Sequence, residues 1–330
     1  MSSAPAARFA DAVGPYADRI CVLLNPAAGQ DEPERLRRLL GGAFAARGAA
    51  IDILATERAG HAAELAARAA ALGYRAVCVV GGDGTVAEAA TGLAGTAVPL
   101  AVVPRGTANQ VAQNLGIPLG VEAAVEVAVH GEAIPIDLGM VGERSFALVA
   151  GAGFDAAVMA SATRELKERW GFGAYVYAAV KEALSATPVP FHLVVDGRAM
   201  DVEAVTVMVA NVGELFTAWL PLRLPLCPAP AREAWQDGLL DVVVLSPRRP
   251  VELARVLWRV TNRHFEGDER LLHFQAREVT ITTERPVPVQ IDGDAAGTTP
   301  MTASVRCGAL RVLVPPAQAG GTSTLKKSPV

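Results

Sequence analysis

The sequence predicts an α/β N-terminal domain with a parallel sheet, followed by a β-rich antiparallel C-terminal domain. Two patterns predict the first domain: short apolar runs alternate with helical segments, and glycine-rich turns follow two of these runs. A third pattern predicts the second domain, because strand-like runs with period-two alternation dominate from residue 138 onward. A chain of 330 residues has ample length for two such domains.

The composition excludes several classes of protein. Hydrophobic residues make up 51% of the chain and the mean hydropathy is +0.30, but much of this apolarity is alanine. No apolar run reaches the roughly 18 residues that a membrane-spanning helix needs, and the N-terminus lacks the basic and apolar regions of a secretory signal. The formal net charge of −4 argues against a nucleic-acid partner. We therefore expect a soluble cytoplasmic protein with no nucleic-acid partner and no transmembrane segment.

The cysteines agree with a reducing compartment. None of the four shows the spacing of a paired metal ligand, and two of them lie inside apolar runs, as buried thiols do. These residues are Cys21, Cys78, Cys227 and Cys307.

The expected first domain covers residues 1–137 and begins with a loose, alanine-rich arm over residues 1–18. Buried strands are recognised as apolar runs that end in a turn, and helices by apolar residues at i, i+3 and i+4. The expected elements are strands over 20–24, 51–56, 76–80 and 100–103, and helices around 36–44, 61–72, 86–90 and 121–129.

The first glycine-rich turn joins the strand over 76–80 to a helix. It reads Gly81-Gly82-Asp83-Gly84-Thr85. Glycines let the backbone approach phosphate groups closely, and a helix N-terminus favours an anion. Asp83 is the unusual member, because a carboxylate repels phosphate unless Mg²⁺ or a transferable proton intervenes. An Asp-Gly turn without a ligand is the alternative interpretation.

The second glycine-containing turn follows the strand over 100–103. It reads Pro104-Arg105-Gly106-Thr107-Ala108-Asn109. Two strand–loop–helix units about 20 residues apart place both loops on one edge of a parallel sheet. The sequence therefore predicts that the two loops form one site together.

The ordered pair of loops resembles the catalytic domain of diacylglycerol kinase-type lipid kinases. That family includes sphingosine and ceramide kinases and bacterial lipid kinases, and its fold is related to that of NAD kinases. The resemblance spans roughly residues 19–316 and adds the turn at Asn25-Pro26 after the first strand. It implies that ATP binds at Asn25, Gly81, Gly82, Asp83, Gly84, Thr85, Gly106, Thr107 and Asn109, together with Mg²⁺.

One departure from the family lies beside this site. The family often has an aspartate directly after the asparagine of the second loop, whereas this chain has Gln110. The effect of that replacement is left open. Glu88, in the helix after the first loop, either braces the phosphate loop or is a solvated carboxylate.

The expected second domain covers residues 138–304. The resemblance implies that the segment 305–316 can return to the first domain, and the composition of 317–330 is that of a disordered tail. Two helices are expected in this domain, one through Leu166, Trp170 and Tyr177 and one over 253–260. The expected strands are 145–150, 191–195, 205–210, 239–245, 279–282, 287–291 and 310–314.

Three acidic motifs of the second domain match the family. Asp155, in Gly-Phe-Asp-Ala, either hydrogen-bonds the polar head of the lipid acceptor or caps a helix. Asp237, in Asp-Gly-Leu-Leu-Asp, matches a residue that holds a structural Mg²⁺ in some family members, with backbone such as that of Leu239; an Asp-Gly turn without metal is the alternative. Asp292 and Asp294 stand where the family has Asp-Gly-Glu, so Asp294 is one methylene shorter than the usual residue.

These motifs predict an ATP- and Mg²⁺-dependent lipid kinase that transfers the γ-phosphoryl group to a lipid hydroxyl. Asp292 and Asp83 compete for the role of general base, with Asp294 as a further catalytic carboxylate. We favour Asp292, because Mg²⁺ near the triphosphate would occupy the lone pairs of Asp83. The family's sphingosine kinases, in contrast, are usually described with the glycine-loop aspartate as base.

Several alternatives stay open at this stage. An NAD kinase shares the first loop, and a nucleotide-binding regulator without catalysis is compatible with Gln110 and Asp294. We expect an acceptor of the diacylglycerol, sphingoid base or ceramide type; an isoprenoid or glycolipid also presents a hydroxyl on an apolar body, and the sequence does not select among them. We expect transient contact with the membrane surface that holds this lipid. A homodimer is compatible with the sequence, which does not specify the oligomeric state.

Overall fold

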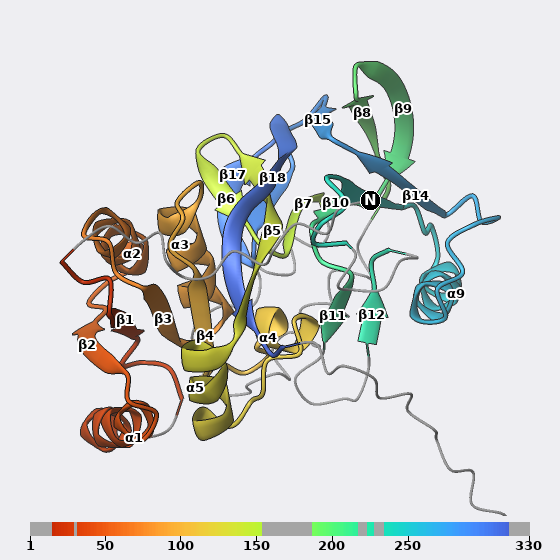
Figure 1. The fold of residues 1–330 in the computed structure, drawn as a ribbon. Helices are drawn as coiled ribbons and strands as arrows, with labels where there is room; N and C mark the ends of the chain where they lie inside the picture. Colours follow the sequence, from red (N-terminus) through yellow and green to blue (C-terminus); the bar gives the residue numbers. More distant parts are fainter. Residues whose placement is uncertain (1–14, 30–31, 154–186, 217–222, 228–233, 317–330) are drawn as a thin grey trace, which may run out of the picture.

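The computed structural model describes residues 15–29, 32–153, 187–216, 223–227 and 234–316, and it confirms the predicted fold class (Figure 1). A sheet that begins with parallel strands forms the first half of the chain, and an antiparallel β-sandwich forms most of the second half. Within the described part of the chain, no helix is both long enough and apolar enough to cross a membrane.

Parallel strands and the helices that cover them form the N-terminal half. Strand β1 pairs in parallel with β2 and β3, and β3 pairs in parallel with β4. Strands β3 and β4 are buried along their whole length, as their continuous apolar sequences require. The elements are β1 (Arg19–Leu24), α1 (Pro33–Ala45), β2 (Ala50–Ala55), α2 (His61–Ala71), β3 (Ala76–Gly81), α3 (Asp83–Leu93), β4 (Leu100–Pro104), α4 (Gln110–Asn114) and α5 (Val121–His130).

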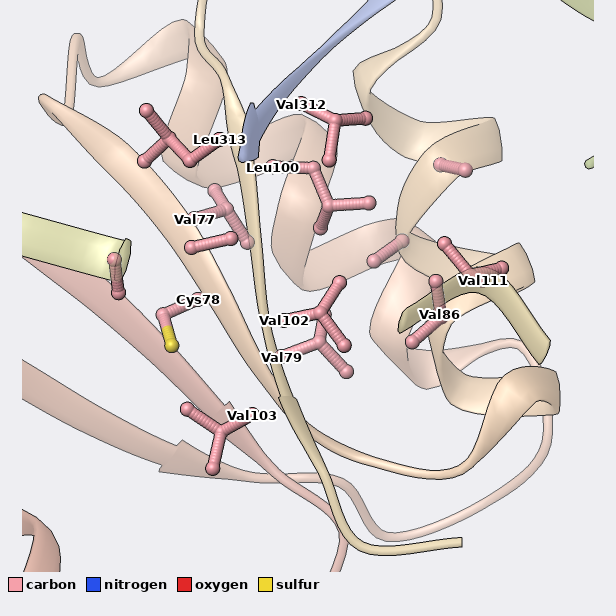
Figure 2. Close-up of a cluster of buried hydrophobic side chains, with 14 of the residues drawn as sticks. Val77, Cys78, Val79, Val86, Leu100, Val102, Val103, Val111, Val312 and Leu313 are labelled. Carbon is pink, nitrogen blue, oxygen red and sulfur yellow. The ribbon is translucent and has the colours of Figure 1, made fainter. Parts of the chain in front are cut away.

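The core of this half anchors the two helices that follow the glycine-rich loops. Figure 2 shows Val79 of β3 and Val102 of β4 pointing toward Val86 of α3 and Val111 of α4. All four side chains are almost completely buried. Their burial fixes where the first turns of α3 and α4 lie above the sheet.

The C-terminal half contains mostly antiparallel strands. The sheet of the first half continues through β18 into β15, β8 and β9, and a second, six-stranded sheet has the order β14-β13-β10-β7-β16-β17. The elements are β5 (Glu132–Val141), β6 (Arg144–Phe146), β7 (Val149–Gly153), β8 (Val189–Val195), β9 (Arg198–Ala204), β10 (Thr206–Ala210), β11 (Glu214–Phe216), β12 (Arg223–Pro225), β13 (Leu240–Leu245), α9 (Pro250–Thr261), β14 (Leu271–Ala276), β15 (Glu278–Thr283), β16 (Pro288–Ile291), β17 (Asp294–Thr298) and β18 (Met301–Val314).

Strand β18 connects the two halves (Figure 1). Its first residues, Met301 and Ala303, belong to the core of the sandwich, whereas Leu310 and Val312 belong to the core of the first half. It pairs with β15 on the sandwich side and in parallel with β4 on the other. A register shift between Arg306 and Leu310 in its pairing with β5 separates the two parts.

The strand expected over 145–150 is in fact two strands, β6 and β7. The break falls at Ala147 and Leu148, whose backbone N–H groups donate to a side chain and not to a neighbouring strand. Strands β9, β14 and β17 were not predicted, because their sequences are polar or mixed and lack a clear alternation. The helix expected through Leu166, Trp170 and Tyr177 lies outside the described residues.

Close packing of α2 on α3 generates a stability prediction. A Cβ atom at Gly92 would lie 2.2 Å from the carbonyl oxygen of Ala63, so Gly92→Ala forces the two helices apart. We expect it to lower the free energy of unfolding by roughly 1–3 kcal/mol. Gly41→Ala in α1 is the control, because a Cβ there meets no atom within 4 Å; it should stabilise by roughly 0.5–1 kcal/mol. Urea unfolding followed by circular dichroism measures both, and equal stability of the two variants would refute this packing.

Candidate active site

The two glycine-rich loops meet backbone to backbone. The backbone N–H of Arg105 donates to the carbonyl oxygen of Gly81 at 2.8 Å, which continues the β3–β4 pairing one residue past the end of β4. A Cβ at Gly106 would lie 2.6 Å from the Cα of Gly82, and a Cβ at Gly82 would lie 3.1 Å from the Cα of Gly106. Only glycine at both positions permits this approach, so the structure brings the two predicted loops together.

Asn25 joins the end of β1 to the first loop. Its side-chain amide donates to Oγ1 of Thr85 at 2.9 Å, and its Oδ1 accepts from the N–H of Ala27 at 3.0 Å. The side chain of Thr85 packs so closely on Gly81 that a Cβ there would lie 3.0 Å from it. Asn25, Gly81 and Thr85 therefore shape the loop, and their predicted contact with ATP stays a prediction.

The second loop is closed by Asn109. This residue has a left-handed backbone (φ 48°), and its side chain both accepts from the N–H of Gly106 and donates to its carbonyl oxygen, each at 2.8 Å. Thr107, between them, is exposed. The loop thus presents Gly106 toward Gly82 and leaves the Thr107 side chain in solvent.

Asp83, in the first loop, connects that loop to the helix that follows the second loop. It is the first residue of α3, and its Oδ1 accepts from the N–H of Val111 in α4 at 3.2 Å. Burial raises the pKa of Asp83, whereas hydrogen bonds from backbone N–H groups at the start of α4 lower it. The carboxylate thereby ties the first turn of α4 to that of α3.

Asn114 fixes the other end of α4. Its side-chain amide donates to the carbonyl oxygen of Gln110 at 3.0 Å and to that of Glu214, in β11, at 2.8 Å. Gln110 itself is the first residue of α4. The short helix that contacts Asp83 is therefore anchored to the C-terminal half of the chain.

Asp292 comes from the C-terminal half and is held by three backbone donors. Its Oδ1 accepts from the N–H groups of Leu148 and Val149, and its Oδ2 accepts from that of Ala147, all at 2.9 Å. Its backbone is left-handed (φ 49°), in the turn between β16 and β17. No sequence signal at 147–149 predicted this cradle, which forms where β6 ends and β7 begins.

The environment of Asp292 raises the pKa of its carboxyl group toward neutrality. Burial raises its pKa to about 6, although the three N–H donors lower it, and the negative charge of Asp83 adds to the rise. The two predicted catalytic carboxylates, from opposite halves of the chain, therefore interact electrostatically. Such a pair is typical of a functional site.

A pocket of about 300 Å³ adjoins Asp292, and Gly84, the neighbour of Asp83 in the chain, also lines it. It lies between the start of α2, one face of α3, strand β6 and the β16–β17 turn. Its lining includes both Asp292 and Asp294, the latter exposed at the start of β17, and small residues form much of its wall. The lining residues are Ala59, Gly60, Ala63, Gly84, Ala87, Glu88, Thr91, Arg144, Ser145, Ile291, Asp292 and Asp294.

Glu88 forms part of this wall in a way that the sequence did not predict. Its two carboxylate oxygens accept from the N–H groups of Gly60 at 2.8 Å and Ala62 at 3.1 Å. It therefore caps the N-terminus of α2 and neither braces the phosphate loop nor extends into solvent. On the same wall, the hydroxyls of Thr91 and Ser145 lie 2.7 Å apart and connect α3 to β6.

Asp237 is not among the residues that line this pocket. The Oδ1 of Asp237 accepts from the N–H of Leu239 at 2.9 Å, which is the geometry of a turn that needs no metal. Burial raises the pKa of Asp237, and the negative charges of Asp241 and Asp137 raise it further, an environment that a cation would relieve. The metal site at Asp237 and Leu239 thus stays a prediction. Asp155 lies outside the described residues.

The loops fit phosphate groups. Among the described residues no side chain caps α3, whose N-cap is Gly82, so the N–H groups of its first turn face the loop junction. No group of three or more His, Cys, Asp or Glu side chains in the described ranges is arranged to hold a metal ion. A Mg²⁺ ion bound with a nucleotide would need only one or two carboxylates in addition to phosphate oxygens and water, and Asp83 is a carboxylate at the loop junction.

Comparisons with known proteins agree with the two-part fold. Residues 19–141 match the family described as diacylglycerol kinase catalytic domain, and residues 148–314 match that described as YegS C-terminal NAD kinase beta sandwich-like domain. A diacylglycerol kinase of Mycobacterium tuberculosis is 33% identical over 307 residues, which cover 90% of this chain and 95% of the relative. A probable lipid kinase YegS-like of Pseudomonas putida is 31% identical over 270 residues, 80% of this chain and 85% of the relative.

One further similarity covers only part of the relative, and another shows the fold alone. An uncharacterized protein of Synechocystis is 30% identical over 69% of this chain, which spans only 51% of that relative. The crystal structure of a diacylglycerol kinase from Bacillus anthracis superposes with a TM-score of 0.68 at 23% identity. It covers 92% of this chain and 98% of that one.

The interaction between the two carboxylates yields a prediction about ionisation. Asp83→Asn removes a negative charge that raises the pKa of Asp292, so this pKa should fall below its value of about 6. The asparagine oxygen can still accept from the N–H of Val111, which preserves the start of α4. The titration is followed by NMR of the aspartate carboxyl carbons, with Asp237→Asn as a control that should leave the pKa of Asp292 unchanged. An unchanged pKa in Asp83→Asn would show that the two groups do not interact.

Proposed function

Because this chain belongs to the diacylglycerol kinase family, with the kinase catalytic domain at residues 19–141, we propose that it transfers the γ-phosphoryl group of ATP to the hydroxyl of a membrane lipid. One observation carries the proposal: the glycine-lined loop junction from the first half of the chain lies beside Asp292 from the second half.

The donor nucleotide would bind with its phosphates at the loop junction. Gly82 and Gly106 leave the backbone accessible there, and the first turn of α3 offers N–H groups to an anion. The pocket of about 300 Å³ begins at Gly84, and its lining includes alanine and glycine from α3 and the start of α2 as well as Asp292 and Asp294, so it leaves room beside the phosphates. In this arrangement Asn25 and Thr85 act as positioning residues that keep the loop in shape, and Thr107 and Asn109 belong to the second loop of the same site.

Mg²⁺ bound with ATP would neutralise phosphate charge and orient the γ-phosphoryl group. Asp83 would hold it, since this residue opens α3 at the loop junction and the N–H of Val111 fixes its carboxylate there by donating to Oδ1. Because the N–H groups of α4 and a cation would both draw on its lone pairs, Asp83 is the weaker candidate for the base.

Asp292 would accept the proton of the acceptor hydroxyl. With a pKa of about 6 it is mainly a carboxylate at neutral pH, yet more basic than an ordinary aspartate. Two N–H groups donate to its Oδ1 and one to its Oδ2, so among the described contacts Oδ2 retains a lone pair for the hydroxyl proton. Asp294, beside it in the pocket, would bind water or the metal shell.

The acceptor we propose is a lipid of the diacylglycerol, sphingoid base or ceramide type. The relatives are named as diacylglycerol and lipid kinases, and their similarity extends across both halves of this chain. Residues 148–314 match a sandwich described as NAD kinase-like, so NAD is the alternative acceptor to test beside the lipids. A protein that binds ATP without turnover is the remaining alternative.

The test uses γ-labelled ATP and the purified protein, with Mg²⁺, mixed micelles of single lipids, and NAD in parallel. We expect label in one lipid class, loss of that label when EDTA removes the metal, and none in NADP. Label only in NADP would replace the proposal by an NAD kinase. ATP binding without any labelled product would replace it by a non-catalytic regulator.

A further inference from the structure

Helix α9 lies at the periphery of the C-terminal half, at the far end of the molecule from α1 and β2 (Figure 1). Its inner face packs on the six-stranded sheet. Val256 and Val260 are buried there against Phe265, Leu271 and strand residues such as Val243. This packing explains the apolar residues on the inner face of α9. It does not explain the apolar residues on the outer face.

The outer face presents two large apolar side chains. Val251, Arg255 and Trp258 follow one another at i, i+4 and i+7, which places them on one side of the helix. Val251 is 70% exposed and Trp258 is 61% exposed, the two highest values among the described exposed large hydrophobic residues. Trp258 stacks on His264, with ring centroids 5.9 Å apart, so the indole has a defined position.

Exposed arginines flank these side chains. Residues 248–263 contain five arginines and one glutamate. Arg259 and Arg263 are partly buried and pair with Asp268 and Glu214, so Arg248, Arg249 and Arg255 are the exposed arginines of this segment. Arg248 pairs with Glu203 and Arg255 pairs with Asp268, yet both arginine side chains stay more than half exposed. Arg249 is exposed at the N-cap of the helix.

We propose that this outer face, defined by Arg249, Val251, Arg255 and Trp258 and here named the α9 face, docks on a bilayer that contains anionic lipids. The proposal rests on the proposed function, which requires the enzyme to reach an acceptor within a membrane. A guanidinium between two apolar side chains matches a surface that offers phosphate groups and acyl chains side by side. Tryptophan is favoured at such an interface because its ring is apolar and its N–H is polar.

A bilayer fits the α9 face better than a protein partner does. One face of a helix of 12 residues is small beside the roughly 800 Å² that each partner buries in a stable protein interface. A membrane imposes no such minimum, since shallow insertion of a few side chains and attraction to anionic headgroups suffice for reversible binding.

The test measures sedimentation of the full chain with vesicles of phosphatidylcholine alone and with added phosphatidylglycerol. We expect binding to the anionic vesicles, weakened as salt screens the charges. The double variant Val251→Ser/Trp258→Ser should bind roughly tenfold more weakly, because less apolar area enters the interface, and Arg249→Glu should weaken it as well. Leu119→Ser is the matched control, since Leu119 is 54% exposed in the loop before α5.

A second measurement separates this proposal from the proposed function. Phosphorylation of a short-chain diacylglycerol dissolved as monomers should be the same in the double variant and the wild type.

Vesicle binding that is equal in all variants, or absent in the wild type, would overturn the proposal for the α9 face, while the proposed lipid phosphorylation would still stand. Binding that depends on Trp258 with no labelled lipid would instead overturn the proposed function. A dimer in solution that the double variant dissociates would identify the face as a self-association surface and overturn the proposal.

Discussion

The contact between Gly82 and Gly106 is the constraint on which the rest of the site depends. Strands β3 and β4 are parallel neighbours in register, so their loops leave the sheet at the same level and must pass each other without side chains. Burial of Val86 and Val111 then fixes the two helices that begin there (Figure 2). Within this frame Asp83, at the start of α3, accepts a hydrogen bond from the start of α4.

The C-terminal half contributes Asp292 to the site, and its backbone N–H groups hold that side chain in place. A break between β6 and β7 exposes the N–H groups of 147–149, and these hold Asp292 beside the loops. Strand β18 connects the two cores, and Asn114 anchors α4 to β11. The electrostatic interaction of Asp83 with Asp292 is therefore a consequence of how the two halves are joined. This joining supports the division of labour that we propose for a lipid kinase, with the donor on one side and the base on the other.

Much of this arrangement could be predicted from the sequence, for identifiable reasons. Continuous apolar runs identified β1, β3 and β4, and glycine turns after two of them identified the loops, because buried parallel strands and tight turns leave strong local signals. The cradle of Asp292 and the capping of α2 by Glu88 left none, since they depend on backbone N–H groups 144 and 28 residues away from the side chains that they bind. Strands with polar faces, such as β9, were missed for the related reason that pairing, not sequence pattern, defines them.

The most direct test of this account compares Asp292→Asn with Asp83→Asn in steady-state turnover and in calorimetric binding of ADP with Mg²⁺. If Asp292 is the base, its variant should lose roughly 10²–10⁴-fold in kcat and keep its affinity for ADP nearly unchanged. Asp83→Asn should weaken nucleotide binding as well as turnover. The opposite result, with ADP affinity lost only in Asp292→Asn and turnover alone lost in Asp83→Asn, would contradict the account and assign the base to Asp83.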